Sequence, residues 1–383
     1  MKICYVCEEF PLETPKGGIA TYQYIISHGM KRYNHEVHVI CKTQYSTRDE
    51  IVDGIILHYL NFKIEENSVE DVITYRKKVY KKMKELEDTV DIFEVADWGG
   101  EAIYYLSERK KPVIIKLHTP FSIWKKYNQV KVDDVWKLRE IYENASLNLA
   151  DALYSCSNSL AQKIQTEYKV DNKIEVIHNP IILNKDITTE KNKDKTLVFI
   201  GSLEERKGVI NLSEILNSIF EMYNDYKFIF IGKDTNRNRY NISTKLIILN
   251  NIKDKFKENV IFTGQLNHAE IKQYIRRASL AIFPSLYENF PYVMIETINE
   301  GCPVLGSLNG GMPEIITHKI SGLLCNPYNA HDILQNIIFA LENETLLQLY
   351  SQQAKKDLVR FDINNIVSQT ISLYERVVRN EKK

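Results

Sequence analysis

Two glutamates, Glu288 and Glu296, lie eight positions apart in the stretch SLYENFPYVMIE, which follows an apolar run typical of a strand. Asn289 is a favourable N-cap, and Pro291 suits the first turn of a helix. We therefore expect a helix that begins near Phe290, with Glu288 in the loop before it. Glu296 then lies about 7–8 Å further along the helix axis, at about 1.5 Å per residue.

This spacing of carboxylates fits a ligand that combines an anion with hydroxyl groups. The free N–H groups at the helix start, near Asn289 and Phe290, can hold a phosphate. Long helical side chains lean toward the N-terminus, so Glu296 can reach hydroxyls such as those of a ribose. Glu288 then faces whatever is joined to the phosphates, and the pattern indicates a nucleotide-sugar. The simpler alternatives are that Glu288 caps its own loop and that Glu296 forms a salt bridge.

A second candidate is the turn FIGSLEERKGV, where Gly201 and Ser202 end an apolar, strand-like run. Arg206 and Lys207 follow within a few residues. In a parallel α/β sheet, ligands bind beyond the carboxyl ends of the strands, and two adjacent cations there suit a diphosphate. An exposed basic turn is the alternative.

A third candidate is the pair Gly17 and Gly18, which lies between a strand-like run and a helical pattern. Small residues at a helix start let backbone N–H groups approach an anion. A tight turn without a ligand explains two glycines equally well. The pattern GxGxxG does not occur at this turn, so a dinucleotide-binding fingerprint is not supported.

Short apolar runs alternate with helical patterns such as 19–32 and 70–88, which favours parallel sheets covered by helices. Strands are expected in two series, at 2–7, 36–41, 54–60, 91–96, 112–118, 152–157 and 174–180, and then at 197–203, 227–233, 259–265, 280–285, 302–307 and 321–327. The stretch 184–196 between the series is polar and lacks apolar periodicity, as linkers do.

We therefore divide the 383 residues into domains at 1–180 and 195–363, joined by a linker at 181–194. The last segment, 364–383, has an apolar stripe at helical spacing. It either caps the second domain or crosses back to brace the first, and we assign it to the first domain.

The composition narrows the range of functions. Lys and Arg number 50 and Asp and Glu number 50, so nucleic-acid binding through net positive charge is not expected. No apolar run reaches about 18 residues, and the start MKICYVCEEF reads as a strand rather than a signal peptide. We expect a cytoplasmic protein. The basic tract 76–85 reads as a solvated helix face, and it leaves peripheral membrane contact open.

Six cysteines do not form a disulfide pattern. Cys4 and Cys7 form a CxxC inside an apolar, strand-like run, and no second pair completes a zinc site. We expect both thiols to pack in the core.

The motifs, taken in order, resemble the retaining glycosyltransferases of family 4, which have the GT-B fold. They are PKGGIATY, YNHEVHVI, LHTP (117–120), GSLEERKG, the pair Glu288 and Glu296, NGGMPEII (309–316) and SGLLCNP (321–327). The resemblance covers nearly the whole chain. It implies an α/β fold with two Rossmann-like domains that face each other across a cleft. The first domain of that family binds the acceptor, and the second binds the nucleotide-sugar.

The resemblance also implies roles in the second domain. Arg206 and Lys207 stabilise the diphosphate, and Ser202 belongs to the same donor-binding turn. Glu296 binds the ribose. Glu288 faces the sugar and phosphates, together with the amides of Asn289 and Phe290, and Leu266 meets the base through its backbone. Pro313 and Glu314 either start a helix or contact the ligand.

In the first domain, the resemblance implies that the loop of Gly17 and Gly18 reaches the phosphates. His118 contacts the donor sugar near its reacting carbon; a hydrogen-bonded histidine at a strand end is the alternative. The sequence departs from the family at HNP (178–180), which stands where PNG is usual. The loop 232–241 does not identify the base.

The resemblance implies a hexosyltransferase that keeps the anomeric configuration. The sequence has no D-x-D, so a metal-clamped enzyme is disfavoured and we expect no metal or other cofactor. The expected donor is a UDP-sugar that carries a hexose or N-acetylhexosamine. The acceptor is a glycan, a lipid-linked intermediate or a small molecule, most often in bacterial surface polysaccharide or glycolipid synthesis.

Two other functions fit the same architecture. A UDP-sugar epimerase would need no acceptor. A non-catalytic partner subunit would bind glycan or support an active transferase, but such chains often lose the second glutamate or the Arg-Lys pair. This chain keeps both glutamates and both cations.

Overall fold

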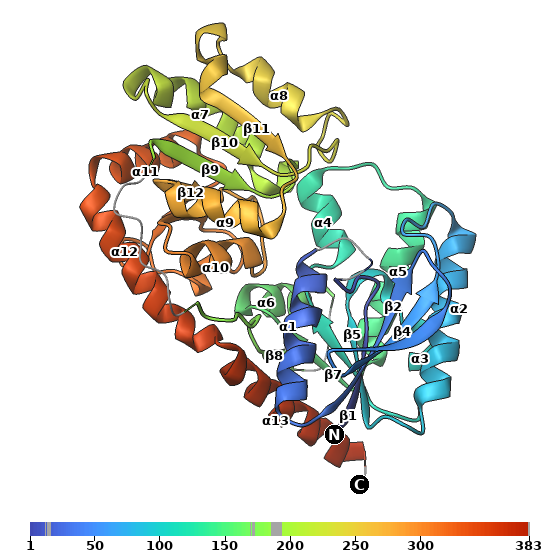
Figure 1. The fold of residues 1–383 in the computed structure, drawn as a ribbon. Helices are drawn as coiled ribbons and strands as arrows, with labels where there is room; N and C mark the ends of the chain where they lie inside the picture. The colour runs from blue at the N-terminus through green and yellow to red at the C-terminus, as the bar shows by residue number, and fades with distance from the viewer. Residues whose placement is uncertain (12, 14–16, 169, 171–172, 185–193, 382–383) are drawn as a thin grey trace. The chain divides into compact units, whose positions relative to one another are not determined.

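The computed structural model describes residues 1–383 except 12, 14–16, 169, 171–172, 185–193 and 382–383. The chain forms two compact units, each built on one sheet (Figure 1). Unit 1 comprises Met1–Ile123, Lys131–Ile182 and Phe361–Lys383, and unit 2 comprises Trp124–Val130 and Leu183–Arg360. Most of the linker expected at 181–194 lies outside the described residues. Two α/β units with parallel sheets confirm the predicted fold class.

Unit 1 has an eight-stranded sheet in the order β3-β4-β2-β1-β5-β6-β7-β8. The strands are β1 (Lys2–Val6), β2 (Glu36–Thr43), β3 (Arg48–Val52), β4 (Ile55–Asn61), β5 (Ile92–Ala96), β6 (Val113–Leu117), β7 (Ala152–Ser155) and β8 (Glu175–Val176). Neighbouring strands are parallel, apart from β3 and β4. The central strands are buried on both faces, which explains why their sequences are continuous apolar runs.

The apolar runs do not predict β3. Its sequence, RDEIV, has its middle three residues exposed, so it carries no buried face that a periodic pattern could reveal. It pairs with β4 in the antiparallel direction, with Glu50 opposite Leu57.

Unit 1 contains the helices expected at 19–32 and 70–88, together with helices for which the sequence predicts no bounds. They are α1 (Gly18–Arg32), α2 (Val69–Leu86), η1 (Trp98–Gly100), α3 (Ile103–Leu106), α5 (Asp134–Leu149), α6 (Asn158–Glu167) and α13 (Ile363–Glu381). Helix α4 (Phe121–Asn128) begins in unit 1, and its residues from Trp124 onward belong to unit 2. Ser68 and Asp133 cap α2 and α5 by accepting hydrogen bonds from backbone N–H groups.

The C-terminal helix α13 packs within unit 1, beside α1 (Figure 1). Gly29 permits this close approach, because a Cβ at this position would lie 2.5 Å from Val367 Cγ2. The Tyr374 hydroxyl donates a hydrogen bond to the buried carboxylate of Glu94 in β5. The end of the chain therefore contributes to the core of its first unit.

Unit 2 has a six-stranded parallel sheet in the order β11-β10-β9-β12-β13-β14. The strands are β9 (Thr196–Ile200), β10 (Lys227–Ile231), β11 (Val260–Gly264), β12 (Leu280–Ile282), β13 (Val304–Ser307) and β14 (Leu323–Cys325). All six fall within the predicted runs or one residue beyond them. Leu197, Phe199, Phe228, Leu280 and Leu305 form part of its buried core.

The helices of unit 2 follow the strands in alternation. They are η2 (Glu205–Lys207), α7 (Val209–Met222), α8 (Thr244–Asn251), η3 (Asp254–Asn259), α9 (His268–Arg277), α10 (Tyr292–Asn299), η4 (Met312–Glu314), α11 (Ala330–Glu342), α12 (Glu344–Asp357) and η5 (Leu358–Phe361), whose last residue belongs to unit 1. None of the helices in the described chain combines the length and the apolar character needed to cross a bilayer.

The thiols of Cys4 and Cys7 are buried and not joined to each other. Cys7 Sγ donates a hydrogen bond to the carbonyl of Glu9 at 3.0 Å. Burial raises the pKa of both thiols, which makes them poor nucleophiles. Both cysteines pack in the core, as predicted.

Candidate active site

The strand order of unit 2 reverses direction between β9 and β12. The chain runs outward from β9 through β10 to β11, and then from β12 through β13 to β14. In open α/β sheets, the carboxyl ends of the strands at such a switch point bind ligands. The segment from Ser202 to Lys207 follows β9, and Glu288 follows β12. Two predicted site segments therefore meet at the switch point.

The turn after β9 is fixed by close backbone packing. Arg206 and Lys207 lie in η2, and Gly208 follows in the left-handed region at φ 73°. A Cβ on Gly208 would lie 1.9 Å from the carbonyl oxygen of Pro284, so only glycine fits there. The turn therefore packs closely against the backbone at Pro284, in the segment that leads to Glu288.

Glu288 forms ion pairs with both predicted cations. Its Oε2 lies 3.0 Å from Arg206 Nη1, and its Oε1 pairs with Lys207 Nζ. Arg206 also pairs with Glu204 at 2.7 Å and donates to the carbonyl of Tyr287 at 3.1 Å. Burial would raise the pKa of Glu288, but Arg206 and Lys207 lower it to about 2. The carboxylate is therefore ionised at all physiological pH values.

The segment 124–130 of unit 2 supports the same turn. Asn128 is fully buried, and its Oδ1 accepts a hydrogen bond from the backbone N–H of Arg206 at 3.1 Å. Gln129 Nε2 donates to Glu205 at 3.0 Å. Sequence reasoning missed these positioning residues, because they lie far from the turn in the chain and match no motif.

Helix α10 begins two residues later than predicted. Its first residue is Tyr292, and Pro291 occupies the N-cap position without a side-chain cap. The physical reason is that a residue before proline is pushed out of helical geometry, which excludes Phe290 from the helix. Asn289 and Phe290 therefore form a buried loop, and the prediction of Asn289 as N-cap is wrong.

The glycines of the motif NGGMPEII contact the backbone of the same loop. Gly311 N–H donates to the carbonyl of Glu288 at 2.8 Å. Gly310 has φ 80°, and a Cβ there would lie 2.0 Å from the Glu288 carbonyl oxygen. Pro313 and Glu314 lie in the short helix η4 that follows. The glycines thus fix the backbone of Glu288.

Glu296 lies in α10 and is half-buried. Burial raises its pKa to about 7, with Lys272 opposing and Glu300 adding to the shift. Glu300 is itself paired with Lys272 and Arg276, at 3.1 and 2.8 Å. Near neutral pH, Glu296 is therefore poised between its acid and its carboxylate.

Ser202 and Leu266 lie at the same edge of the second sheet. Ser202 follows β9 and is half-buried, and Leu266 lies between β11 and α9. The structure thus places every predicted donor residue of unit 2 after the carboxyl end of a strand.

His118 follows β6 in unit 1. Its backbone N–H donates to Asp97 Oδ2 at 2.9 Å, and its ring packs edge-on against Tyr22 at 5.0 Å. Burial and the nearby Lys116 hold the pKa of His118 well below its usual value, so the imidazole is neutral. Burial raises the pKa of Asp97 to about 7. Sequence reasoning did not identify Asp97 as the residue that positions His118.

Gly17 and Gly18 lie at the start of α1, as predicted. A Cβ on Gly17 would lie 2.7 Å from Glu9 Oε2, so the carboxylate of Glu9 reaches the helix start. Burial raises the pKa of Glu9 to about 7, and a hydrogen bond from the Gly17 backbone opposes that shift. This amide therefore already has the carboxyl group of Glu9 as its hydrogen-bond partner.

Family models match consecutive parts of this chain. The model of glycosyltransferase family 4 matches residues 16–185, and the model of glycosyl transferases group 1 matches residues 181–357. The chain belongs to the family 4-like glycosyltransferases. Both units of this glycosyltransferase are covered, in the order that the motifs predict.

One relative of this family 4-like glycosyltransferase spans nearly its whole length, and another spans part of it. It is 23% identical over 397 residues to an uncharacterised glycosyltransferase of Methanocaldococcus jannaschii, with 98% of each chain covered. It is also 23% identical to the N-acetyl-alpha-D-glucosaminyl L-malate synthase of Bacillus anthracis, over 61% of each chain.

Solved structures share the GT-B fold of the glycosyltransferase. Sucrose-phosphate synthase from Thermosynechococcus elongatus has a TM-score of 0.81 at 16% identity, with 99% of each chain covered. Anabaena HepE in complex with UDP has a TM-score of 0.69 at 16% identity, with 98% of this chain and 100% of that chain covered.

Proposed function

We propose that this glycosyltransferase moves a hexose or N-acetylhexosamine from a UDP-sugar to an acceptor hydroxyl, with retention of configuration and without a metal. The observation that carries the proposal is the ion-paired cluster of Arg206, Lys207 and Glu288 at the switch point of the second sheet. Two adjacent, pre-positioned cations suit the two phosphates of the donor. The structure of HepE with UDP supports the choice of base.

In the proposed reaction, the diphosphate takes over Arg206 and Lys207 from the Glu288 carboxylate. The bond from the anomeric carbon to the phosphate oxygen breaks, and its electron pair stays on that oxygen. The acceptor hydroxyl oxygen bonds to the anomeric carbon on the same face. Its proton passes to the departing phosphate oxygen, so atoms and charge balance. Fixed positive potential at the departing phosphate is the main catalytic effect.

The remaining residues bind and orient the donor. Glu296 accepts hydrogen bonds from the ribose hydroxyls, and the backbone after Glu288 faces the phosphates. The neutral imidazole of His118 offers a hydrogen bond to the sugar without adding a charge. Gly17 offers a backbone amide that suits an anion, because Glu9 already occupies it.

For the acceptor, we propose a glycan, a lipid-linked intermediate or a small molecule in the synthesis of bacterial surface polysaccharide or glycolipid. The enzyme would then work in the cytoplasm, at or near the inner face of the membrane. The malate synthase of Bacillus anthracis supports a small-molecule acceptor as one member of this set.

The deciding experiment measures melting temperature against UDP-, GDP- and ADP-sugars. A ligand that binds only the folded protein stabilises it by RT ln(1 + [L]/Kd), about 2.7 kcal/mol at a hundredfold excess over Kd. We expect UDP-sugars to stabilise most, with and without EDTA. Proton NMR of the glycoside should show the donor's anomeric configuration. An epimer formed without acceptor, or stabilisation by none of the donors, would contradict the proposal.

A further inference from the structure

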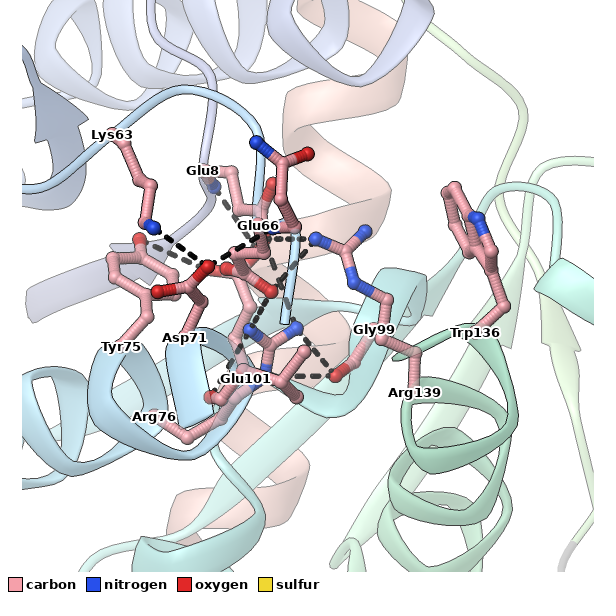
Figure 2. A network of polar contacts seen from close by, with 12 residues as sticks. Glu8, Lys63, Glu66, Asp71, Tyr75, Arg76, Gly99, Glu101, Trp136 and Arg139 are labelled. Carbon is pink, nitrogen blue, oxygen red and sulfur yellow. Dashed lines mark hydrogen bonds and ion pairs between the residues drawn. The ribbon is translucent and has the colours of Figure 1, made fainter. Parts of the chain in front are cut away.

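Lys116 in β6 differs from the other cations that are buried in unit 1. In the described chain, the others share the carboxylate of Glu66, and Figure 2 shows two guanidinium groups directed at it. They are Lys42 at 2.7 Å, Arg76 at 2.6 Å and Arg139 at 2.7 Å. Lys116 is 0% exposed, yet it forms no ion pair within the described residues. A buried charge without an ion pair is costly, so its presence in the core indicates a role for the charge itself.

One carbonyl and two aromatic rings hold the ammonium group of Lys116. Its Nζ donates a hydrogen bond to the carbonyl of Ile177 at 2.7 Å. The same atom lies 4.9 Å from the centre of the Tyr22 ring and 4.4 Å from the centre of the Tyr154 ring. The face of an aromatic ring attracts a cation, because it carries partial negative charge. The charge of Lys116 is therefore held in place without being neutralised.

Three titratable groups lie near Lys116 without forming an ion pair with it. Burial lowers the pKa of Lys116 to about 8, and Cys156, Glu94 and Asp97 oppose that shift. Burial raises the pKa of both Glu94 and Asp97, which weakens the negative charge that either can offer. The charge of Lys116 is therefore largely present at neutral pH, and it is lost as the pH rises through about 8.

Tyr22 on α1 contacts both Lys116 and His118. Its ring packs edge-on against the imidazole, with 5.0 Å between the ring centres and an interplanar angle of 66°. Its hydroxyl donates to the carboxylate of Glu94 at 3.1 Å and lies 2.6 Å from the hydroxyl of Tyr154. All five side chains are buried, so water cannot screen the ammonium charge from the imidazole effectively. The network therefore fixes a cation close to His118.

The groups around His118 favour its uncharged form. Lys116 repels a proton on the imidazole and, together with burial, holds the pKa of His118 well below its usual value. Tyr22 keeps its hydroxyl proton, because burial raises its pKa well above the usual value. Asp97 after β5 spends its Oδ2 on the backbone N–H of His118, at 2.9 Å. Of these groups, Lys116 is the one whose charge opposes protonation of the imidazole.

We propose that Lys116 is a positioning residue for sugar transfer: its buried charge makes His118 present an uncharged imidazole to the donor sugar. The inference rests on the proposed function, in which His118 forms a hydrogen bond with that sugar. Positive charge develops on the anomeric carbon when its bond to the phosphate oxygen breaks, and an imidazolium beside it would oppose this step. A neutral imidazole still forms the hydrogen bond. Lys116 is fully buried, so it acts through His118 rather than on the substrate.

The test follows the imidazole resonances of His118 by NMR while the pH of the full chain is varied. The chain has nine histidines, and His118→Gln identifies the resonance of this residue by its loss. In the unsubstituted protein, we expect no protonation of His118 between pH 6 and 8. A small change of its chemical shift near pH 8 should mark the loss of the Lys116 charge. In Lys116→Met, protonation of His118 should move to higher pH, because the repelling cation is gone.

Turnover at saturating donor separates this role from a structural one. The rate of Lys116→Met, divided by the rate of the unsubstituted enzyme, should fall at least about threefold between pH 7.5 and 5.5. Glu296 titrates in both proteins, so its contribution cancels in this ratio. Lys116→Arg is the matched control, because it keeps the charge, and it should restore the pH profile of the unsubstituted enzyme. A purely structural role of Lys116 would lower the rate by the same factor at every pH.

Unchanged protonation of His118 in Lys116→Met, or a rate ratio that does not depend on pH, would overturn the proposal. If Lys116→Met fails to fold, the unsubstituted protein still decides, since protonation of His118 between pH 6 and 8 would contradict the proposal. The NMR titration contains no donor or acceptor, so its result is independent of whether the chain transfers sugar from UDP. A chain without transferase activity in which His118 still responds to Lys116 would refute the proposed function and leave this electrostatic link standing.

Discussion

At the scale of the residue, carboxylates occupy the groups that are proposed to bind ligand anions. Glu288 holds Arg206 and Lys207, and Glu9 reaches the amide of Gly17. Each of these cationic or N–H groups is therefore compensated before a ligand arrives. In the proposed reaction, a phosphate therefore has to compete with the Glu288 carboxylate for Arg206 and Lys207.

Substitution of Glu288 by Gln should separate binding from chemistry. The variant frees Arg206 and Lys207, so UDP should bind roughly tenfold more tightly, or about 1.4 kcal/mol. Turnover should fall at least about a hundredfold, the scale for loss of one group that acts in the transition state. Calorimetry with UDP and initial rates with the UDP-sugar measure the two effects.

The matched control is Arg206→Gln, which should weaken UDP binding and turnover together. If Glu288→Gln weakened UDP binding as much as Arg206→Gln, the carboxylate would be part of the phosphate site rather than its competitor.

The raised pKa of Glu296 predicts that nucleotide binding depends on pH. Ribose hydroxyls donate hydrogen bonds to the carboxylate form of Glu296. Because the pKa of Glu296 is about 7, the residue has to lose a proton before it can bind the ribose below that pH. Affinity for UDP should therefore rise with pH up to about 7 and stay level above it, by up to tenfold per pH unit below the pKa. Calorimetry between pH 6 and 8 measures this slope. In Glu296→Gln the contribution of this residue should vanish, whereas an unchanged slope would point to another group.

Motifs predict the residues whose side chains form the candidate site better than they predict the residues that position those side chains by hydrogen bonds. Arg206, Lys207 and Glu288 could be grouped because each follows a strand that its apolar run makes visible. Asn128 could not, because its hydrogen bond to Arg206 joins positions 78 residues apart and amides of this kind carry no spacing signal. Asp97 was missed for the same reason.

At the scale of the element, the sequence predicts strands that are buried on both faces and misses a strand whose residues are mostly exposed. The parallel strands are apolar on both faces, so their runs mark them. The exposed β3 leaves no such mark. The start of α10 was misplaced because the N-cap preference of Asn289 was weighed without the constraint that Pro291 imposes on Phe290.

The glycine turn that supports Glu288 should be sensitive to added volume. Gly310→Ala places a Cβ at φ 80° and against the Glu288 carbonyl. Gly264→Ala is the matched control, since Gly264 has φ 72° and a Cβ there would meet nothing within 4 Å. The left-handed conformation alone costs about 1–2 kcal/mol. We expect Gly264→Ala to lose about this much unfolding free energy and Gly310→Ala clearly more.

Turnover gives a second readout for this pair. Gly310→Ala should also lower the rate at saturating donor, because the Glu288 backbone has to move. Equal losses of stability in the two variants, with equal rates, would show that the turn absorbs the methyl group and does not position Glu288.

At the scale of the whole molecule, the first unit is closed by the last helix of the chain. Segments from both ends of the sequence belong to it, and Ile181 N–H donates to the carbonyl of Phe361 at 2.9 Å where the chain returns. Sequence periodicity identifies α13 as an amphipathic helix, but it cannot say which core receives the apolar stripe. That choice depends on contacts such as the one between Gly29 and Val367, which only the folded chain brings together.

Tyr374 offers a measure of how much this closure contributes. Glu94 is 2% exposed and accepts hydrogen bonds from Tyr22 at 3.1 Å and from the hydroxyls of Tyr154 and Tyr374. Tyr374→Phe removes the donor that α13 supplies and leaves a buried carboxyl less satisfied, which should cost about 1–3 kcal/mol of unfolding free energy. Tyr240→Phe is the control, because Tyr240 is 59% exposed.

Urea unfolding followed by emission of Trp98 and Trp136, in the Trp124→Phe background, reports on unit 1 alone. Equal midpoints for the two variants would mean that the hydrogen bond from α13 does not help to hold unit 1 together. A shift confined to Tyr374→Phe would show that the hydrogen bond from α13 to Glu94 stabilises the first unit.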